Sequence, residues 1–309
     1  MADDAALQPH PRAARARLVP REPLPGTPRR APQRRLARAG PRLRLRAPRA
    51  GDGGAAELPV SEVRVGVLDW GIGGVDALAR LRARFPRLPL TYWSDSGFAP
   101  YGKVPARALA ARVAAVARRM DVSHLVVACN AASTVLDEAD LPVPTLGVIS
   151  PGVALALASP ARSFGVIGGE RTIASGAWER PLVAAGRTVR ARVAQPLSAH
   201  VEAGRLDGAA LERDLDAILA PLAGVEALIL ACTHYPAIAG PIRRRLPGVP
   251  LVDPVDALID AAADVWRLAD RGDGALRVLT TGAAAETRWA ALRAFGVTLD
   301  PTEVPPDAP

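Results

Sequence analysis

Two cysteines are the residues of this 309-residue chain whose type and spacing point most directly to chemistry, and the chain contains no others. Cys129 lies in LVVACN (125–130) and Cys232 lies in LILACT (228–233), so each follows an apolar run and an alanine. A free thiol has a pKa of about 8.5, nearer neutrality than Lys or Tyr, and can act as an acid, base, nucleophile or metal ligand. Because a cysteine that only filled a core has no reason to recur at both places, the repeat indicates reactive thiols.

Polar side chains follow further apolar runs. Asp69 ends VRVGVLD and precedes WGIGG, SDSGFAPYG carries Asp95 and Tyr101, and His234 lies in ACTHYP. We interpret Asp95 as a turn or cap residue, with a contact to a bound substrate as the alternative. GIGG misses the G-x-G-x-x-G spacing because residue 76 is Asp, so it does not indicate a dinucleotide site. A tight turn and an anion-binding helix start both explain its glycines.

The elements that must position these side chains have the texture of an α/β protein. From Val63 onward, short apolar runs alternate with longer Ala/Leu/Arg stretches of helical spacing. The expected strands are 63–69, 89–95, 124–130, 145–151, 163–169, 225–232 and 276–282. The expected helices are 75–85, 108–120, 172–186 (broken), 206–223 and 286–296. Both cysteines end central strands, which is where open parallel sheets bind ligands.

Composition limits the class of protein. Hydrophobic residues make up 49% of the chain, which is enough for two buried cores. We find no apolar run near the roughly 20 residues of a membrane span, and no secretory leader, so we expect a cytoplasmic protein. Two cysteines make no disulfide framework, and free thiols are expected.

The net charge of +8 belongs to one segment. Residues 1–57 hold 13 Arg and 5 acidic residues, while the remainder holds 26 basic and 26 acidic residues. This segment is rich in Pro, Arg and Ala and shows no hydrophobic period, so we expect a disordered basic tail. A nucleic-acid-binding arm is the alternative, although nucleic acid is not the partner that we favour.

Taken together, the motifs resemble glutamate racemase, a cofactor-independent enzyme that supplies D-glutamate for bacterial peptidoglycan. The resemblance covers about 63–299. Its carriers are VGVLDWGIGG, the D-x-x-x-x-P-Y-G run of 95–102, VVACNAAS, FGVIGGERTIASGAW and ACTHYP, with TTG at 280–282.

The resemblance implies an α/β fold of two pseudo-symmetric lobes, each a mainly parallel sheet flanked by helices, with the active site in the cleft between them. Lobe 1 would comprise 58–153 plus 256–300, and lobe 2 would comprise 154–255. We expect 301–309 to be a disordered C-terminus. The resemblance also implies a homodimer, glutamate as the small-molecule substrate, and no cofactor, metal or membrane.

Inverting an α-carbon requires removing its proton on one face and delivering another on the opposite face, which two thiols can do symmetrically. The resemblance assigns Cys129 to the proton of D-glutamate and Cys232 to that of L-glutamate. It makes Asp69 and His234 their respective helpers, which modulate ionisation or accept the ammonium proton. The substrate-binding positions that it implies are Asp69, Tyr101, Gly102, Asn130, Thr233 and His234.

Three residues depart from the family pattern. Trp70 stands where the family usually has Ser, Ala131 where it has Thr, and Gly169 where it often has Thr. Losing a hydroxyl removes a hydrogen bond worth about 0.5 to 1.5 kcal/mol. A catalytically weak relative with a shifted amino-acid substrate, or with a nucleic-acid role through its tail, is therefore the alternative function. A zinc site and a single-cysteine hydrolase explain the paired thiols less well.

Overall fold

The computed structural model describes residues 63–306. The predicted basic tail of 1–57 lies outside the described residues, as do 307–309. Within the described part, no helix is both long and apolar enough to cross a membrane.

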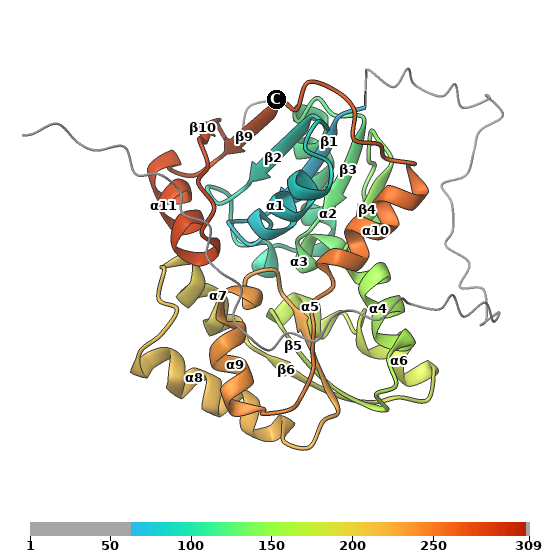
Figure 1. The fold of residues 1–309 in the computed structure, drawn as a ribbon, viewed down its shortest axis with the longest axis vertical. Helices are drawn as coiled ribbons and strands as arrows, with labels where there is room; N and C mark the ends of the chain where they lie inside the picture. The colour runs from blue at the N-terminus through green and yellow to red at the C-terminus, as the bar shows by residue number, and fades with distance from the viewer. Residues whose placement is uncertain (1–62, 307–309) are drawn as a thin grey trace, which may run out of the picture. The chain divides into compact units, whose positions relative to one another are not determined.

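The first sheet has six parallel strands in the order β10-β9-β2-β1-β3-β4 (Figure 1). Its strands are β1 (Val65–Asp69), β2 (Leu90–Ser94), β3 (His124–Val127), β4 (Thr145–Gly147), β9 (Leu276–Thr280) and β10 (Thr302–Glu303). Every residue of β1 and β2 is buried, as expected for central parallel strands covered on both faces. Alternate side chains serve different cores, with Val67 packing on the side of helix α1 and Leu68 on the side of helix α2.

The second sheet has four parallel strands in the order β6-β5-β7-β8. They are β5 (Ser163–Gly168), β6 (Thr188–Val193), β7 (Ala227–Ala231) and β8 (Leu251–Val252). Figure 1 shows this sheet below the first, so that the two sheets occupy different halves of the described part. Two mainly parallel sheets flanked by helices confirm the predicted fold class.

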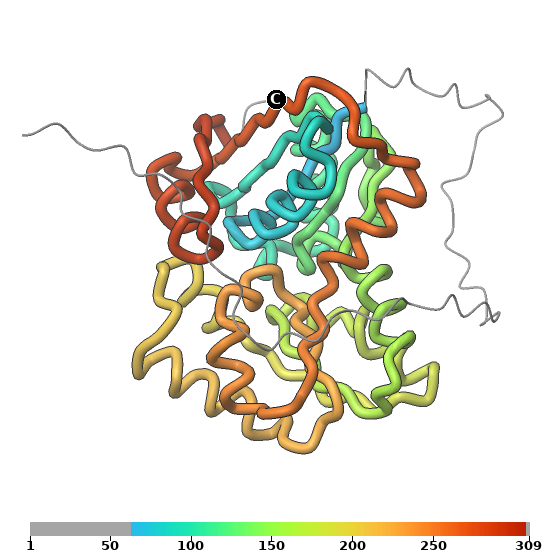
Figure 2. Tube along the Cα trace, viewed as in Figure 1, coloured from blue at the N-terminus to red at the C-terminus, as the bar shows by residue number. Residues whose placement is uncertain are grey.

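Helices cover both sheets. Those formed by residues before β5 and after β8 are α1 (Val75–Arg84), α2 (Ala106–Arg119), the short α3 (Asn130–Ser133), α4 (Ile149–Ala158), α10 (Val255–Val265) and α11 (Ala284–Phe295). Those between β5 and β8 are α5 (Glu170–Ala174), α6 (Glu179–Ala184), α7 (Gln195–Glu202), α8 (Ala209–Leu219) and α9 (Ala239–Arg245). The tube in Figure 2 follows the chain from α4 into the second sheet and back through α10, which packs against α1.

Helix α1 illustrates why such segments fold. Val75, Leu78 and Leu81 recur at helical spacing and are buried against the sheet. Asp76 lies in the first turn and basic residues lie in the last turn. Charges in these positions interact favourably with the helix dipole and stabilise the helix at both ends.

Several local expectations were incomplete. The stretch 145–151 was expected to be one strand, but β4 ends at Gly147 and α4 begins at Ile149. Pro151 is the third residue of α4, where its missing N–H costs nothing because first-turn amides have no acceptor within the helix. The sequence reasoning also left out β6, α7, α9, β8 and α10.

The C-terminal expectation differs from the structure over part of its range. Residues 301–309 were expected to be disordered, but Thr302 and Glu303 pair with Leu279 and Thr280 of β9. The backbone amide of Val304 continues this pairing by donating to the carbonyl of Thr280 at 2.8 Å. The free edge of β9 thus gives this short segment hydrogen-bond partners.

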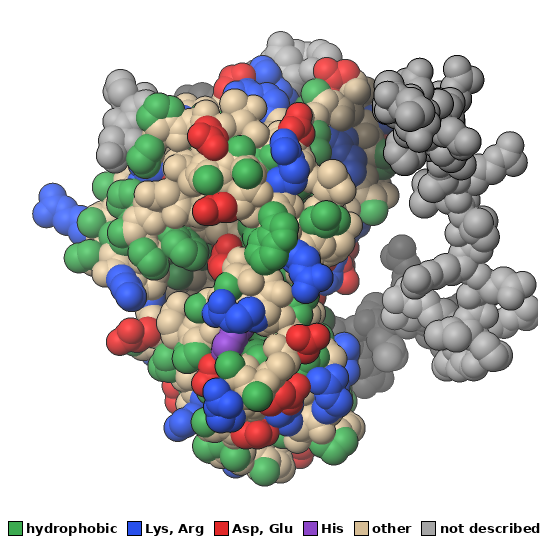
Figure 3. All heavy atoms as spheres, turned by 90° about the vertical axis from the view of Figure 1, so that its left-hand side faces the viewer, with side chains coloured by type: hydrophobic (Ala, Val, Ile, Leu, Met, Phe, Trp, Pro, Cys, Tyr) green, Lys and Arg blue, Asp and Glu red, His purple; other side chains and the backbone are tan. Residues whose placement is uncertain are grey.

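The surface of the described part carries both signs of charge. In the face drawn in Figure 3, acidic and basic side chains are interspersed, with apolar side chains between them. This mixture agrees with the balance of 26 basic and 26 acidic residues outside 1–57.

Candidate active site

A cavity of about 870 Å³ is lined by loops that follow strands of both sheets. From the first sheet come Asp69 at the end of β1 and Trp70 after it, the stretch 100–103 after β2, and the stretch 129–131 after β3. From the second come Gly169 after β5 and the run Cys232 to His234 after β7. The structure therefore brings together every residue predicted for the site, because the carboxyl ends of the strands face one shared space.

Asp69 is a buried acid at the end of β1. Its Oδ2 accepts a hydrogen bond from Thr233 Oγ1 at 2.9 Å, and its Oδ1 accepts one from the backbone N–H of Gly71 at 3.3 Å. Burial raises the pKa of Asp69 to about 6, although the positive charge of His234 and the two hydrogen bonds oppose this rise. Since Thr233 follows a strand of the other sheet, one of these bonds joins the two sides of the cavity.

Cys129 lies between β3 and the short helix α3 and is buried against the cavity. Burial, and then the negative charge of Asp69, raise the pKa of the Cys129 thiol well above its usual value. The backbone N–H groups of Ala132 and Trp70 act in the opposite direction but do not outweigh these effects. Cys129 is therefore a protonated thiol near neutral pH, which suits an acid.

Cys232 has a histidine as its neighbour, in contrast to the acidic neighbour of Cys129. Its Sγ lies 3.5 Å from Nδ1 of His234, whose Nε2 lies 2.5 Å from Oε1 of Glu202. Burial alone would lower the pKa of His234, but the Cys232 sulfur and the Glu202 carboxylate raise it well above its usual value. The positive charge of His234 therefore lies directly beside the Cys232 sulfur.

Glu202 is the member of this chain of contacts that the sequence reasoning missed. It ends helix α7, lines the cavity, and its Oε1 also accepts the backbone N–H of Ile72 at 3.0 Å. Burial opposes ionisation of Glu202, but the hydrogen bond and charge of His234 lower its pKa. An acidic partner for a buried histidine is a general expectation, yet nothing in QPLSAHVE (195–202) marks this residue.

Asn130 offers the cavity an unused donor. Its Oδ1 accepts a hydrogen bond from Trp178 Nε1 at 3.0 Å, which fixes the amide. Its Nδ2 is buried and has no acceptor among residues 63–306. A buried donor of this kind is costly unless a partner reaches it, so Nδ2 suits a bound anionic group.

Tyr101 and Gly102 line the cavity from the 3₁₀ turn η2 (Tyr101–Lys103). The Tyr101 hydroxyl is committed to Asp95 Oδ2 at 2.7 Å, so it does not act from the cavity wall as a free donor. Contacts from this turn to a molecule in the cavity would therefore come from its backbone. Lys103, the only lysine of the chain, also lines the cavity and is exposed.

Two glycines of GIGG (71–74) allow the two sides of the cavity to approach each other closely. A Cβ on Gly73 would lie 2.2 Å from Thr233 Oγ1 and 2.7 Å from His234 Nδ1, and a Cβ on Gly71 would lie 2.0 Å from Glu202 Oε1. Neither glycine has a positive φ. The requirement is therefore space for the residues opposite, and not a left-handed turn.

The residues that depart from the family pattern have defined positions. Trp70 lines the cavity and is held by a hydrogen bond from its Nε1 to the carbonyl of Phe98 at 3.0 Å. Ala131 and Gly169 line it as well. Trp70 therefore forms part of the wall.

The other two histidines among residues 63–306 lie in structural contacts. His200 contacts Asp214 at 2.7 Å, and the ring of His124 lies 4.8 Å from that of Trp266. Among the residues that the structure describes, no group of three or more His, Cys, Asp or Glu could hold a metal ion.

A model of the Asp/Glu/hydantoin racemase family matches residues 78–262. The glutamate racemase of Limosilactobacillus reuteri is 32% identical over 235 residues, which span 71% of this chain and 88% of the relative. The chain belongs to the Asp/Glu/hydantoin racemase family.

Solved structures agree with this assignment. Glutamate racemase from Thermus thermophilus in complex with beta-chloro-D-alanine has a TM-score of 0.70 and 32% identity, and the match covers 79% of this chain and 98% of that one. Glutamate racemase from Francisella tularensis in complex with D-glutamate has a TM-score of 0.72 over 81% of this chain and 99% of that one. At 23% identity, the latter supports the fold.

Proposed function

We propose that this chain is a glutamate racemase that interconverts L-glutamate and D-glutamate by moving protons between two thiols, without a cofactor. The observation that carries the proposal is that Cys129 and Cys232 line one cavity from the ends of strands in different sheets. A carbon held between them can lose a proton to one sulfur and gain a proton from the other.

In the proposed starting state for L-glutamate, Cys129 carries a proton and Cys232 does not. With L-glutamate bound, the Cys232 thiolate accepts the α-proton, and the electron pair left on the α-carbon then accepts the Cys129 proton. The products are D-glutamate, a Cys232 thiol and a Cys129 thiolate, so atoms and charge balance. The reverse reaction uses the same groups in exchanged roles.

The remaining residues assist this transfer. The negative charge of Asp69 acts on the nearby Cys129 thiol. With a pKa of about 6, the Asp69 carboxyl can also accept or hold a proton of the substrate ammonium. Nδ2 of Asn130 and the backbone of Gly102 and Thr233 are donors for the carboxylates. His234 and Glu202 keep positive charge beside Cys232. Donors aimed in advance at developing charge lower the barrier.

The test is incubation of the full chain with L-glutamate in deuterated water, followed by chiral separation and mass analysis. We expect D-glutamate to appear with deuterium at Cα, since the Cys129 thiol exchanges with solvent, while unreacted L-glutamate stays unlabelled early in the reaction. Absence of D-glutamate would refute the proposed function. Equal early labelling of both enantiomers would refute two separate bases.

A shifted substrate is the second candidate, favoured by Trp70 and Ala131 at positions where the family usually has hydroxyl side chains. L-aspartate incubated in parallel tests it. Conversion of aspartate faster than glutamate would support the second candidate and count against the first.

Further expectations follow from the same proposal. We propose that lobe 1 comprises 58–153 plus 256–300, extended by β10 (Thr302–Glu303), and that lobe 2 comprises 154–255. The strands of the two sheets support this division, because β1 to β4, β9 and β10 belong to one sheet and β5 to β8 to the other. We also propose a homodimer, testable by analytical ultracentrifugation, and a cytoplasmic enzyme that supplies D-glutamate for peptidoglycan.

A further inference from the structure

We propose that residues 301–306 form a strap that holds the cavity loop 95–103 in place through Arg112 and Asp95, and so sets the affinity for substrate. The kinetic part of this inference rests on the proposed racemase function. Its structural part does not, because the contacts can be followed without any reaction.

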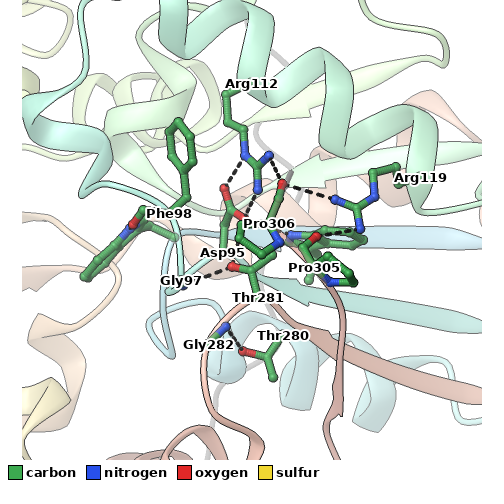
Figure 4. A network of polar contacts seen from close by, with 12 residues as sticks. Asp95, Gly97, Phe98, Arg112, Arg119, Thr280, Thr281, Gly282, Pro305 and Pro306 are labelled. Carbon is green, nitrogen blue, oxygen red and sulfur yellow. Dashed lines mark hydrogen bonds and ion pairs between the residues drawn. The ribbon is translucent and has the colours of Figure 1, made fainter. Parts of the chain in front are cut away.

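The strap is attached to the first sheet and then reaches across to helix α2. After β10, the carbonyl of Pro305 accepts a hydrogen bond from Arg119 Nη2 at 2.8 Å, and the carbonyl of Pro306 accepts one from Arg112 Nη1 at 2.5 Å (Figure 4). Proline has no N–H, so these two residues offer the arginines acceptors only. Two charged donors on one helix therefore hold the strap.

Arg112 links the strap to Asp95. Its Nε donates to Asp95 Oδ2 at 2.8 Å and its Nη2 donates to Asp95 Oδ1 at 2.5 Å, while its guanidinium lies 4.4 Å from the ring centre of Phe98. Asp95 is fully buried. The planar guanidinium presents its donors in a fixed fork, so the position of the carboxylate depends on the position of the arginine.

The Asp95 carboxylate also accepts hydrogen bonds from side chains of three other segments. It accepts hydrogen bonds from Tyr101 OH at 2.7 Å, Thr281 Oγ1 at 3.1 Å and Trp93 Nε1 at 3.3 Å. Its earlier interpretation as a turn or cap residue is incomplete, because its side chain is the centre of a network (Figure 4). A buried carboxylate with this many donors fixes all of them.

The loop that Asp95 holds forms one wall of the cavity. The amide of Phe98 donates to the carbonyl of Asp95 at 3.0 Å, and the carbonyl of Phe98 accepts the indole N–H of Trp70. Tyr101 and Trp70 both line the cavity. The carbonyl of Tyr101 also accepts Arg171 Nε at 3.1 Å, from a helix that follows β5 of the other sheet. The strap is therefore linked to the part of the cavity wall that Trp70 and Tyr101 form. Neither cysteine thiol takes part in the hydrogen-bond network around Asp95.

Two shortened chains form a matched pair for the test. A chain ending at Val304 keeps β10 but loses the carbonyls of Pro305 and Pro306, whereas a chain ending at Pro306 keeps the Pro305 carbonyl and presents the Pro306 oxygens to Arg112 as a terminal carboxylate. We expect KM for L-glutamate to rise about fivefold in the first with kcat within about twofold of the full chain, and no rise in KM in the second.

Substitutions of the arginines extend the test within the full chain. Arg112→Lys keeps the charge but loses the fork, so we expect KM to rise about tenfold with little change in kcat. Arg119→Gln loses a strap contact without touching Asp95, so its effect should be smaller. A fall in kcat with unchanged KM in Arg112→Lys would overturn the inference.

Hydrogen exchange provides a readout without activity. The amides of Phe98 and Lys103, which bond within the loop, should exchange faster in the Val304 chain and in Arg112→Lys than in the Pro306 chain. The amides of β5 should not change. Unaltered exchange at Phe98 and Lys103 would refute the strap. If the Val304 chain fails to fold, Arg112→Lys carries the same measurement, and faster loop exchange in a protein that does not racemise glutamate would refute only the function.

Discussion

The two cysteines occupy similar places in sequence but different electrostatic surroundings. Cys129 lies in the field of the buried Asp69, which favours its thiol, and Cys232 lies beside a histidine that Glu202 helps to keep protonated. The resting protein therefore favours a protonated thiol at Cys129 and places a positive charge beside the Cys232 sulfur. The proposed reaction from L-glutamate uses this asymmetry.

Replacing either cysteine tests their joint role. We expect Cys129→Ala and Cys232→Ala each to lower kcat for racemisation by at least about 10³-fold, because each removes an acid/base group that no other residue replaces. Chiral chromatography measures the rate, and circular dichroism checks that the fold is intact. Retention of a tenth of the turnover by either variant would contradict the assignment.

The raised pKa of Asp69 predicts a pH dependence of stability. Its carboxyl binds a proton in the folded state up to about pH 6 but in the unfolded state only below about 3.8. The folded state therefore holds more protons between these values, and stability falls as pH rises through this window. Relative to Asp69→Asn, the wild type should lose on the order of 2 to 3 kcal/mol between pH 4 and 7.5.

Urea denaturation of both proteins at the two pH values measures this difference. Glu202 and His234 are common to both, so their contributions largely cancel. An unchanged difference between the two proteins across the range would contradict a raised pKa for Asp69.

At the residue scale, the sequence was informative where motifs end strands. Asp69, Cys129, Cys232 and His234 line one cavity as expected, because adjacent parallel strands carry their following loops to one edge. Glu202 could not be found in this way. It lies on a helix, and its contact with Ile72 joins residues 130 positions apart, which no local pattern records.

Among the elements, the β1–α1 loop leaves no space for a side chain at Gly73. A Cβ on Gly73 would collide with Thr233 and His234. A Cβ on Gly240, in helix α9, would meet only the end of the Arg244 side chain at 4.0 Å. The two glycines are therefore a matched pair, one in the site and one remote from it.

We expect Gly73→Ala to lower kcat/KM at least about tenfold, because displacing His234 alters the charge beside Cys232. Gly240→Ala should keep full activity and gain about 0.4 to 1 kcal/mol in the free energy of unfolding, because Gly240 has no positive φ and alanine reduces the conformational freedom of the unfolded chain. Steady-state kinetics and thermal melts measure both effects. Equal activity of the two variants would contradict the close approach.

Element prediction worked best for buried strands and amphipathic helices. The runs that became β1, β5 and β7 are apolar except for Asp69 at the end of β1 and Ser163 at the start of β5, as expected for central parallel strands. Edge strand β6, TVRARV, carries two arginines and is largely exposed, so its weak pattern was overlooked. Helix α4 was hidden because Pro151 resembles a stop signal although it lies in the first turn.

For the molecule as a whole, charge and function are separated along the chain. The basic excess lies in residues 1–57, whereas the cavity is lined by residues between Asp69 and Ala290. We therefore expect a chain lacking 1–57 to keep kcat/KM for glutamate within about twofold, since contributions to the field from remote exposed charges are screened by salt.

The same deletion tests the nucleic-acid alternative. Any binding of the full chain to duplex DNA should weaken steeply with salt and disappear without residues 1–57, as expected for contacts between arginine and phosphate. Fluorescence anisotropy with a labelled duplex measures it. Binding that survives the deletion would place a nucleic-acid surface on the folded part, and a tenfold loss of activity would show that the tail contributes to catalysis.

Lys103 gives the molecule a built-in attachment point. Apart from the α-amino group at the start of the chain, its ε-amine is the one primary amine present, and Lys103 is an exposed residue of the cavity lining. An amine-directed fluorophore on Lys103 would therefore lie beside the cavity while both sulfurs remain native. Changes in its emission could then report ligand entry in real time, without any engineered cysteine.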